Sequence, residues 1–258
     1  FRRVLFRSDR VLASDRLPDV DRRRRRRGRD FRGGGLDCQR QLHGRLVSFR
    51  ARRRGDDGAR LRKLGLDGNK VKFIVLSHAH GDHDGSVKFL QDTYKSRVVM
   101  GPKDWELAAR EANPPKRDIE ATDGQKITLG DTTVTIYITP GHTEGTLSVL
   151  VPVKDHGVPH MAMEWGGTAL SPNTSKEMLR SYISNAGRLK DISGGMGADV
   201  IIVNHTDYND ALVRLDRTKT RKDGDPNPWV VGKAEVTKYL DVVEECAKSW
   251  LAVANGQP

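Results

Sequence analysis

Residues 78–83 read His-Ala-His-Gly-Asp-His and directly follow the apolar run 71–77. Neutral imidazole nitrogens and carboxylate oxygens are preferred ligands of zinc and similar divalent ions. A solvated surface has no need to crowd four such groups, because the imidazoles repel one another once they are protonated. The nearly continuous β-branched and aromatic residues of 71–77 indicate a buried strand, and the apolar spacing in 82–91 indicates a helix. The sequence therefore predicts a metal site in a strand-to-helix loop.

The spacing within this loop divides its ligands into two sets. Alternate residues of an extended segment point the same way, so His78 and His80 are expected to reach one ion. Asp82 and His83 lie further along the turn and are expected to reach a second ion.

Two other histidines follow predicted strands. His142 lies in a Pro-Gly turn after the strand 132–138, and His205 follows the strand 200–203. Because side chains at strand ends converge in α/β folds, we expect both to join the metal site. The remaining histidines lack this context and are expected to be ordinary residues: His43, His156 and His160.

The combined pattern resembles the metallo-β-lactamase superfamily over roughly residues 63–258. The resemblance implies an α/β (α+β) fold, an αββα sandwich of two mixed sheets with helices outside. It implies a hydrolase that uses a hydroxide bound to zinc, with two zinc ions as cofactor. It assigns one zinc to His78, His80 and His142. It assigns the other to Asp82, His83 and His205, and Asp82 would also orient the nucleophile.

One departure places the chain within this superfamily. Many of its thioesterases and lactonases carry a bridging Asp where this sequence has Gly167, and the cysteine of one β-lactamase group is absent too. Glu164 is offset by three residues and is a poor substitute. The remaining set is similar to the β-lactamase subclass with His/His/His and Asp/His/His sites, and 224–230 also resembles that subclass. The substrate implied is a β-lactam-like cyclic amide or a related ester. A lactone, a thioester or a phosphodiester remains an alternative, since fold does not define function.

Contacts beyond the metal ligands are less specific. Four residues adjoin ligand positions and are candidates for lining a substrate pocket, with loop packing as the alternative: Trp165, Asn204, Thr206 and Tyr208. Glu144 follows His142 by two positions and is a candidate hydrogen-bond partner of a liganding imidazole. No Gly-x-Ser-x-Gly elbow and no glycine-rich phosphate loop offers another chemistry.

The formal net charge of +11 is unevenly distributed. Residues 1–62 contain 21 Arg and 8 Asp, a balance of +13, whereas the remainder has 24 basic and 26 acidic residues, a balance of −2. The same leader contains no Lys, Glu, Ile, Asn, Thr, Tyr, Met or Trp. A phosphate-binding arm would normally mix Lys with Arg. This composition therefore favours the hypothesis that the leader is encoded by GC-rich DNA translated in a shifted reading frame.

We therefore expect two regions: a leader, 1–58, that is disordered or frame-shifted, and a metallo-β-lactamase-like domain, 59–258. The N-terminal strands of the sandwich would then be missing or disrupted. The alternative is an Arg-rich arm that binds nucleic acid beside a damaged domain. The balance of −2 in the rest of the chain disfavours a nucleic-acid partner and leaves a small-molecule substrate.

The other predicted elements alternate regularly. They are strands at 97–100, 125–129, 132–138, 146–153, 160–165 and 200–203, helices at 104–113 with Asp104 as N-cap, 176–189 and 233–254, and a long charged segment at 206–231. No apolar run is long enough for a transmembrane helix, so no membrane partner is expected. Two cysteines, Cys38 and Cys246, imply no disulfide framework. The family resemblance is compatible with a periplasmic or secreted protein.

Overall fold

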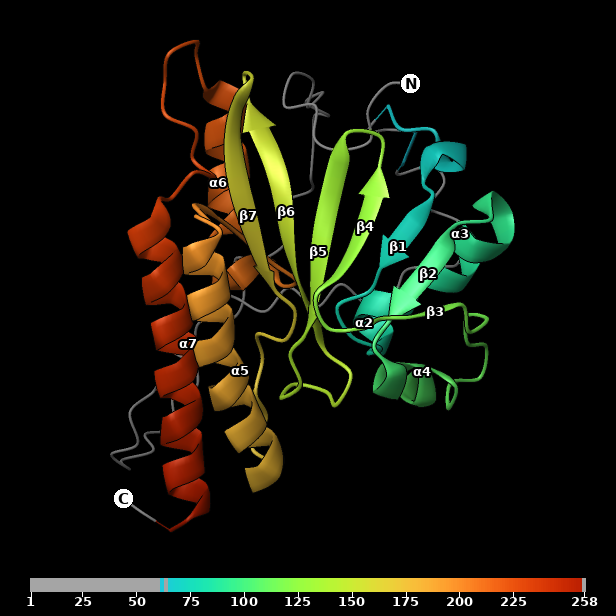
Figure 1. Cartoon of the computed structure of the whole chain (residues 1–258), viewed down its shortest axis with the longest axis vertical. Helices are drawn as coiled ribbons and strands as arrows, with labels where there is room; N and C mark the ends of the chain where they lie inside the picture. The colour runs from blue at the N-terminus through green and yellow to red at the C-terminus, as the bar shows by residue number, and fades with distance from the viewer. Residues whose placement is uncertain (1–60, 63–64, 257–258) are drawn as a thin grey trace, which may run out of the picture.

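The computed structural model describes residues 61–62 and 65–256 (Figure 1). The predictions for residues 1–58, namely the leader, its alternative role as a basic arm and the disruption of the first strands, lie outside the described residues.

Within residues 65–256, eight strands form two sheets that face each other (Figure 1). The first sheet is parallel and has the order β1 (Phe73–Val75), β2 (Arg97–Met100), β3 (Ile119–Glu120). The second has the order β4 (Gln125–Leu129), β5 (Thr132–Ile138), β6 (Leu147–Asp155), β7 (Val158–Trp165), β8 (Val200–Val203). Neighbouring strands within the second sheet are antiparallel, except for the last pair, β7 and β8, which is parallel.

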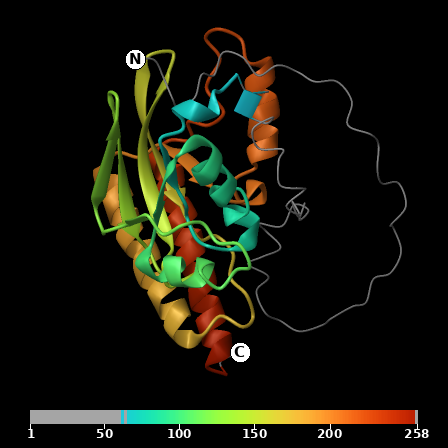
Figure 2. The same cartoon turned by 90° about the vertical axis from the view of Figure 1, so that its right-hand side faces the viewer.

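Helices cover the outer faces of both sheets. The helices are α2 (Gly81–Asp84), α3 (Val87–Tyr94), α4 (Pro102–Ala108), α5 (Lys176–Gly195), α6 (Ala211–Thr220) and α7 (Lys233–Ala254), with short 3₁₀ turns η1 (Gly68–Lys70) and η2 (Thr206–Tyr208). Side chains of α3 and α4 pack on the first sheet, and the long pair α5 and α7 packs on the second (Figures 1 and 2). The predicted αββα layering is confirmed.

Strand β2 shows how the sequence forms these layers. Val98, Val99 and Met100 are fully buried. Because side chains alternate between the two faces of a strand, both faces of β2 must be covered. Val98 and Met100 face the helices and pack with Trp105 of α4. Val99 faces the other sheet and packs with Ile136 of β5. A continuous apolar run at this position is therefore required for a strand buried on both sides.

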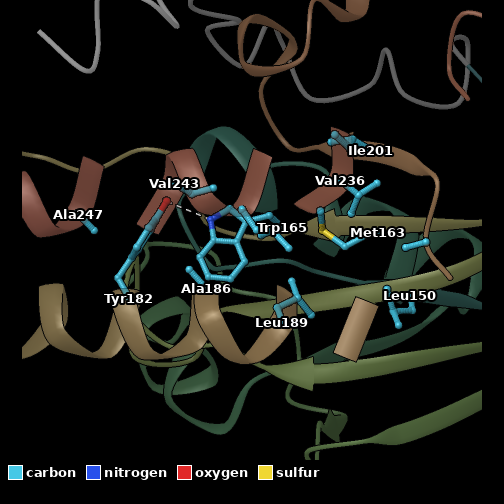
Figure 3. Packing of buried hydrophobic residues seen from close by; sticks show 12 residues of the cluster. Leu150, Met163, Trp165, Tyr182, Ala186, Leu189, Ile201, Val236, Val243 and Ala247 are labelled. Carbon is cyan, nitrogen blue, oxygen red and sulfur yellow. Dashed lines mark hydrogen bonds between the residues drawn. The ribbon is translucent and has the colours of Figure 1, made fainter. Parts of the chain in front are cut away.

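The largest apolar cluster lies between the second sheet and its two helices. Figure 3 shows Trp165 of β7 beside Tyr182 of α5 and Val243 of α7, with Met163 of β7 in the same cluster near Val236 of α7. The rings of Trp165 and Tyr182 meet edge to face with centroids 5.1 Å apart. Helix α5 begins at the N-cap Ser175, whose hydroxyl accepts a hydrogen bond from the amide of Met178 at 3.2 Å. This cluster supports β7, whose carboxyl end carries the residues discussed below.

Some predicted boundaries were wrong. The helix expected at 82–91 is divided into α2 and α3 at Gly85. Helix α4 begins at Pro102 with Gly101 as N-cap, so Asp104 lies within the first turn and is not the cap. The segment expected as a long loop at 206–231 contains η2 and α6. Within the described part of the chain, no helix combines the length and apolar content needed to cross a bilayer.

Candidate metal centre

The two sheets touch at the ends of their strands, and this contact positions the loop that carries His78 and His80. The amide of Leu147, at the start of β6, donates to the carbonyl of Ser77 at 2.7 Å. Gly166, directly after β7, approaches so closely that a Cβ atom there would lie 1.7 Å from the Leu147 carbonyl oxygen. His78 follows Ser77 and is therefore held where β1, β6 and β7 meet.

Three histidines converge at this point. The Nε2 atom of His142 lies 3.1 Å from Nε2 of His78 and 3.1 Å from Nδ1 of His80. In each ring one nitrogen faces the same small space, and His78 is buried whereas the other two rings are partly buried. The turn after β5 delivers His142, and the loop after β1 delivers the other two, as their strand-end positions predicted.

The hydrogen bonds on the far sides of two rings fix their tautomers. His78 donates from Nδ1 to the carbonyl of Gly166 at 2.8 Å, and His142 donates from Nδ1 to the carbonyl of Ala169 at 2.5 Å. A neutral imidazole with a proton on Nδ1 has only a lone pair on Nε2. Two bare lone pairs 3.1 Å apart repel each other unless a cation lies between them. Zinc–nitrogen bonds of about 2.0–2.1 Å in a tetrahedral site place the nitrogens about 3.3 Å apart, so this donor set fits a zinc ion.

Burial also keeps these rings neutral. Burial, followed by the charge of His142, lowers the pKa of His78 to about 2. Burial lowers the pKa of His142 to about 4, although the bond to Ala169 opposes this change. Neutral rings at pH 7 have nitrogen lone pairs available as metal ligands.

A second group lies beside the first and is more open to solvent. Nε2 of His83 lies 3.2 Å from Nε2 of His205 and 3.4 Å from Oδ2 of Asp82, and His205 lies 3.8 Å from the same oxygen. Burial lowers the pKa of His83, and the carboxylate of Asp82 opposes this shift. The side chain of Asp82 is 51% exposed. The second group therefore offers two imidazoles and one carboxylate at a solvent-accessible edge.

Asn204 supports the first group from behind. Its amide nitrogen donates to the carbonyl of Gly166 at 2.7 Å, the same carbonyl that accepts from His78. Its amide oxygen accepts from the hydroxyl of Thr168 at 2.8 Å. Asn204 thus helps to orient the His78 ring through a shared carbonyl.

The other residues proposed from the sequence are distributed differently. Trp165 is 1% exposed, and its indole nitrogen donates to the carbonyl of Gly167 at 2.9 Å and the hydroxyl of Tyr182 at 3.0 Å, so it lies in the core. Tyr208 is half-buried beside His205, with ring centroids 6.1 Å apart. Thr206 and Glu144 are exposed.

The histidines expected to be ordinary stand outside both groups where the structure describes them. His160 pairs with Asp199 at 2.6 Å, and His156 is exposed in the turn between β6 and β7. His43 lies outside the described residues.

Gly167 packs directly on His142. A Cβ atom at this position would lie 2.3 Å from the Cβ of His142. No side chain fits between them, so no bridging carboxylate can replace this glycine without moving His142. Glu164 belongs to neither ligand group among the described residues, because it pairs with Val149 on the face of β7 between the sheets.

Sequence reasoning missed Asp104. It was assigned to a helix cap, but its buried carboxylate accepts hydrogen bonds from the loops that carry the three histidines. Its distance along the chain from either loop left no local pattern that would have revealed this contact.

An αββα sandwich with two adjacent sets of imidazole and carboxylate ligands at its strand ends defines a metallohydrolase domain. The model of the metallo-β-lactamase superfamily matches residues 34–156, and the chain carries a domain of this superfamily. Members of the superfamily bind metal ions, typically zinc, and act as hydrolases on small molecules.

Known proteins give the same fold. BJP-1, a subclass B3 metallo-β-lactamase of Bradyrhizobium japonicum, superposes with a TM-score of 0.64 at 24% identity, covering 77% of this chain and 79% of that one. Native FEZ-1 metallo-β-lactamase from Legionella gormanii gives a TM-score of 0.68 at 21% identity, covering 76% and 80%. At these identities the likeness concerns the fold.

A curated relative gives a shorter match. A hydroxyacylglutathione hydrolase of Rhodopseudomonas palustris is 34% identical over 85 residues, which are 33% of this chain and 31% of that protein. The alignment thus spans about a third of the length of this relative.

Proposed function

We propose that this chain is a two-zinc hydrolase that opens a β-lactam-like cyclic amide or a related ester. The observation that carries the proposal is the convergence of His78, His80 and His142, two of which face each other with bare Nε2 lone pairs. The group of Asp82, His83 and His205 supplies ligands for a second ion.

The residues have separate tasks. His78, His80 and His142 would hold one ion through imidazole nitrogens, and Asp82, His83 and His205 would hold the other. Zinc held in this way would lower the pKa of a water molecule towards neutrality and would polarise a substrate carbonyl. Asp82 uses Oδ2 towards the two imidazoles, and Oδ1 remains for orienting the attacking water and accepting its proton. No Ser or Cys nucleophile is needed.

The proposed substrate class depends on the close contact between Gly167 and His142. The thioesterases and lactonases that the motif resembles carry a bridging Asp at this place, and here the backbone packs on His142 instead. This arrangement supports a β-lactamase-like site with separate ligand sets. The sequence match to a hydroxyacylglutathione hydrolase favours a second candidate, hydrolysis of a thioester.

A nucleic-acid substrate is disfavoured by charge. Residues 63–258 carry 24 basic and 26 acidic residues, a balance of −2, whereas phosphate-backbone binding relies on clustered Lys and Arg. This charge balance therefore favours a small-molecule substrate over a nucleic acid.

The test uses the full chain, freed of metal and reloaded with zinc. Zinc content would be measured together with turnover of a chromogenic cephalosporin, a lactone and a hydroxyacyl thioester. We expect about two zinc ions per chain and preferential turnover of the cephalosporin. His80→Ala should lose about one zinc and at least about 100-fold in kcat/KM, a loss at or beyond the upper end known for outer-shell residues.

His156→Ala is the matched control, because its side chain is 63% exposed and lies outside both groups. It should leave zinc content and turnover unchanged. Preferential turnover of the thioester would favour the second candidate. A folded, zinc-loaded chain that hydrolyses none of the three substrates would refute the proposed function.

A further inference from the structure

Asp104 lies between the two loops that carry the three-histidine group. It is 1% exposed and sits in the first turn of α4. Its Oδ2 accepts from the amide of Ala79 at 2.8 Å and from the hydroxyl of Thr143 at 3.0 Å. Its Oδ1 accepts from the amide of Gly145 at 3.1 Å. One carboxylate therefore joins a residue of the first loop to two residues of the second.

These hydrogen bonds reach the two loops at or near positions adjacent to the three histidines. Ala79 stands between His78 and His80, and Thr143 follows His142. A shift of the carboxylate would therefore change the separation of His142 from the other two rings. In the present arrangement Nε2 of His142 lies 3.1 Å from Nε2 of His78 and 3.1 Å from Nδ1 of His80.

The start of α4 packs closely against the second loop. A Cβ atom at Gly145 would lie 2.4 Å from the Asp104 amide nitrogen and 2.7 Å from its Oδ1. A Cβ atom at Gly101 would lie 2.0 Å from the Gly145 carbonyl oxygen. The backbones of the start of α4 and of the second loop thus approach closely, which places the Asp104 carboxylate within hydrogen-bond distance of the Gly145 amide.

We propose that Asp104 is a positioning residue, which fixes the three-histidine group by joining both of its loops through one buried carboxylate. A carboxylate is costly to bury, and three donors compensate it only in part. A full positive charge held by neutral imidazoles nearby would complete the compensation, which explains why an acid and not an amide occupies this place. The inference rests on the proposed function in one respect, that the three histidines hold a metal ion.

The first variant is Asp104→Asn, which preserves shape but removes the charge and turns one acceptor into a donor. Its amide NH₂ must face one of the three donors, so one loop is released. We expect the zinc affinity of the three-histidine group to fall about 10–100-fold, the effect known for outer-shell partners of metal ligands. The group of Asp82, His83 and His205 should keep its affinity.

The control is Asp199→Asn. Asp199 also accepts from a backbone amide, that of Met161 at 3.1 Å, and from a side chain, His160 at 2.6 Å. It precedes β8, whereas His205 follows that strand, so it lies at the end of the sheet away from the ligands. Asp199→Asn should lower stability without altering the zinc affinity of either group.

The experiment is zinc competition against a chromophoric chelator with the full chain, combined with Co²⁺ absorption spectra. Hydrogen exchange of the Ala79 and Gly145 amides reports the two loops directly. Asp104→Asn should weaken one of two zinc constants, alter the Co²⁺ spectrum and speed the exchange of one of the two amides, the one in the released loop. If this variant does not fold, Thr143→Val keeps the charge and removes a single donor, and it should weaken the same constant about fivefold.

Two outcomes would overturn the inference: zinc constants and spectra like those of the unaltered chain, or the same loss in Asp199→Asn as in Asp104→Asn. The readout is separate from hydrolysis. An unaltered chain that binds two zinc ions but hydrolyses nothing would refute the proposed function, and the affinities would still decide the role of Asp104.

Discussion

Gly167 offers the sharpest test of the metal site, because only one added methyl group is needed. In Gly167→Ala the new Cβ would lie 2.3 Å from the His142 Cβ and 3.2 Å from Cγ2 of Thr146. Carbon atoms prefer a separation of about 3.5–4.0 Å, so His142 must move by more than about 1 Å. Distances from a metal ion to its ligands stay within about 0.2 Å of their usual values. Overpacking of this kind costs about 1–3 kcal/mol, and if this strain is relieved by losing the metal, zinc affinity falls about 5- to 150-fold.

The assay is chelator competition on the full chain, with zinc bound to the three-histidine group as the readout. Gly194→Ala in α5 is the matched control, because a Cβ there meets nothing within 4 Å. It should leave zinc affinity unchanged and raise helix stability slightly. If Gly167→Ala bound zinc within about twofold of the unaltered chain, the close contact with His142 would not constrain the site. Close packing at Gly167 would then not exclude a bridging carboxylate at this position.

Two further predictions concern stability. Burial raises the pKa of Glu164 from its usual 4.5 to about 7, so its contribution to stability is fully present below pH 4.5 and is lost as the pH rises through 7. Glu164→Gln does not titrate, and its gain in free energy of unfolding over the unaltered chain should grow across that window to at most about 3 kcal/mol. Urea unfolding at about pH 5 and pH 8 measures this, and a difference independent of pH would show that Glu164 is solvated. Ser175→Ala removes the hydroxyl that caps α5 at Met178 and should cost about 1 kcal/mol in the same assay; an unchanged midpoint would mean that water replaces the cap.

The sequence predicted those parts of the fold that depend on local pattern. The strands β2, β4, β5 and β8 have the bounds expected from alternation and from short apolar runs. Helix α7 likewise spans 233–254, because its apolar stripe is continuous. The separation of the ligands into two groups followed from their spacing in one loop, since alternate residues of an extended segment point the same way.

Features that depend on contacts between distant segments could not be predicted. Asp104 is 25 positions from Ala79 and 41 from Gly145, and only the folded chain brings its carboxylate to both loops. A local cap was the simplest interpretation of an acid near a helix start, but Pro102 at the first helical position moves the start forward. Trp165 was proposed as a pocket residue because it adjoins the site in sequence. Alternation along β7 instead turns its ring into the core.

The residues matched by the superfamily model are not those from which the substrate class is proposed. The superfamily model ends at residue 156, so it includes the first loop and His142 but neither Gly167 nor His205. Gly167 and Asn204 meet the shared part of the site from behind, one against the His142 ring and the other through the carbonyl that holds His78. A thioesterase-like site would need a carboxylate where Gly167 now leaves less room than one methyl group. Introducing a carboxylate at position 167 would therefore require His142 to be repacked, and not a single substitution alone.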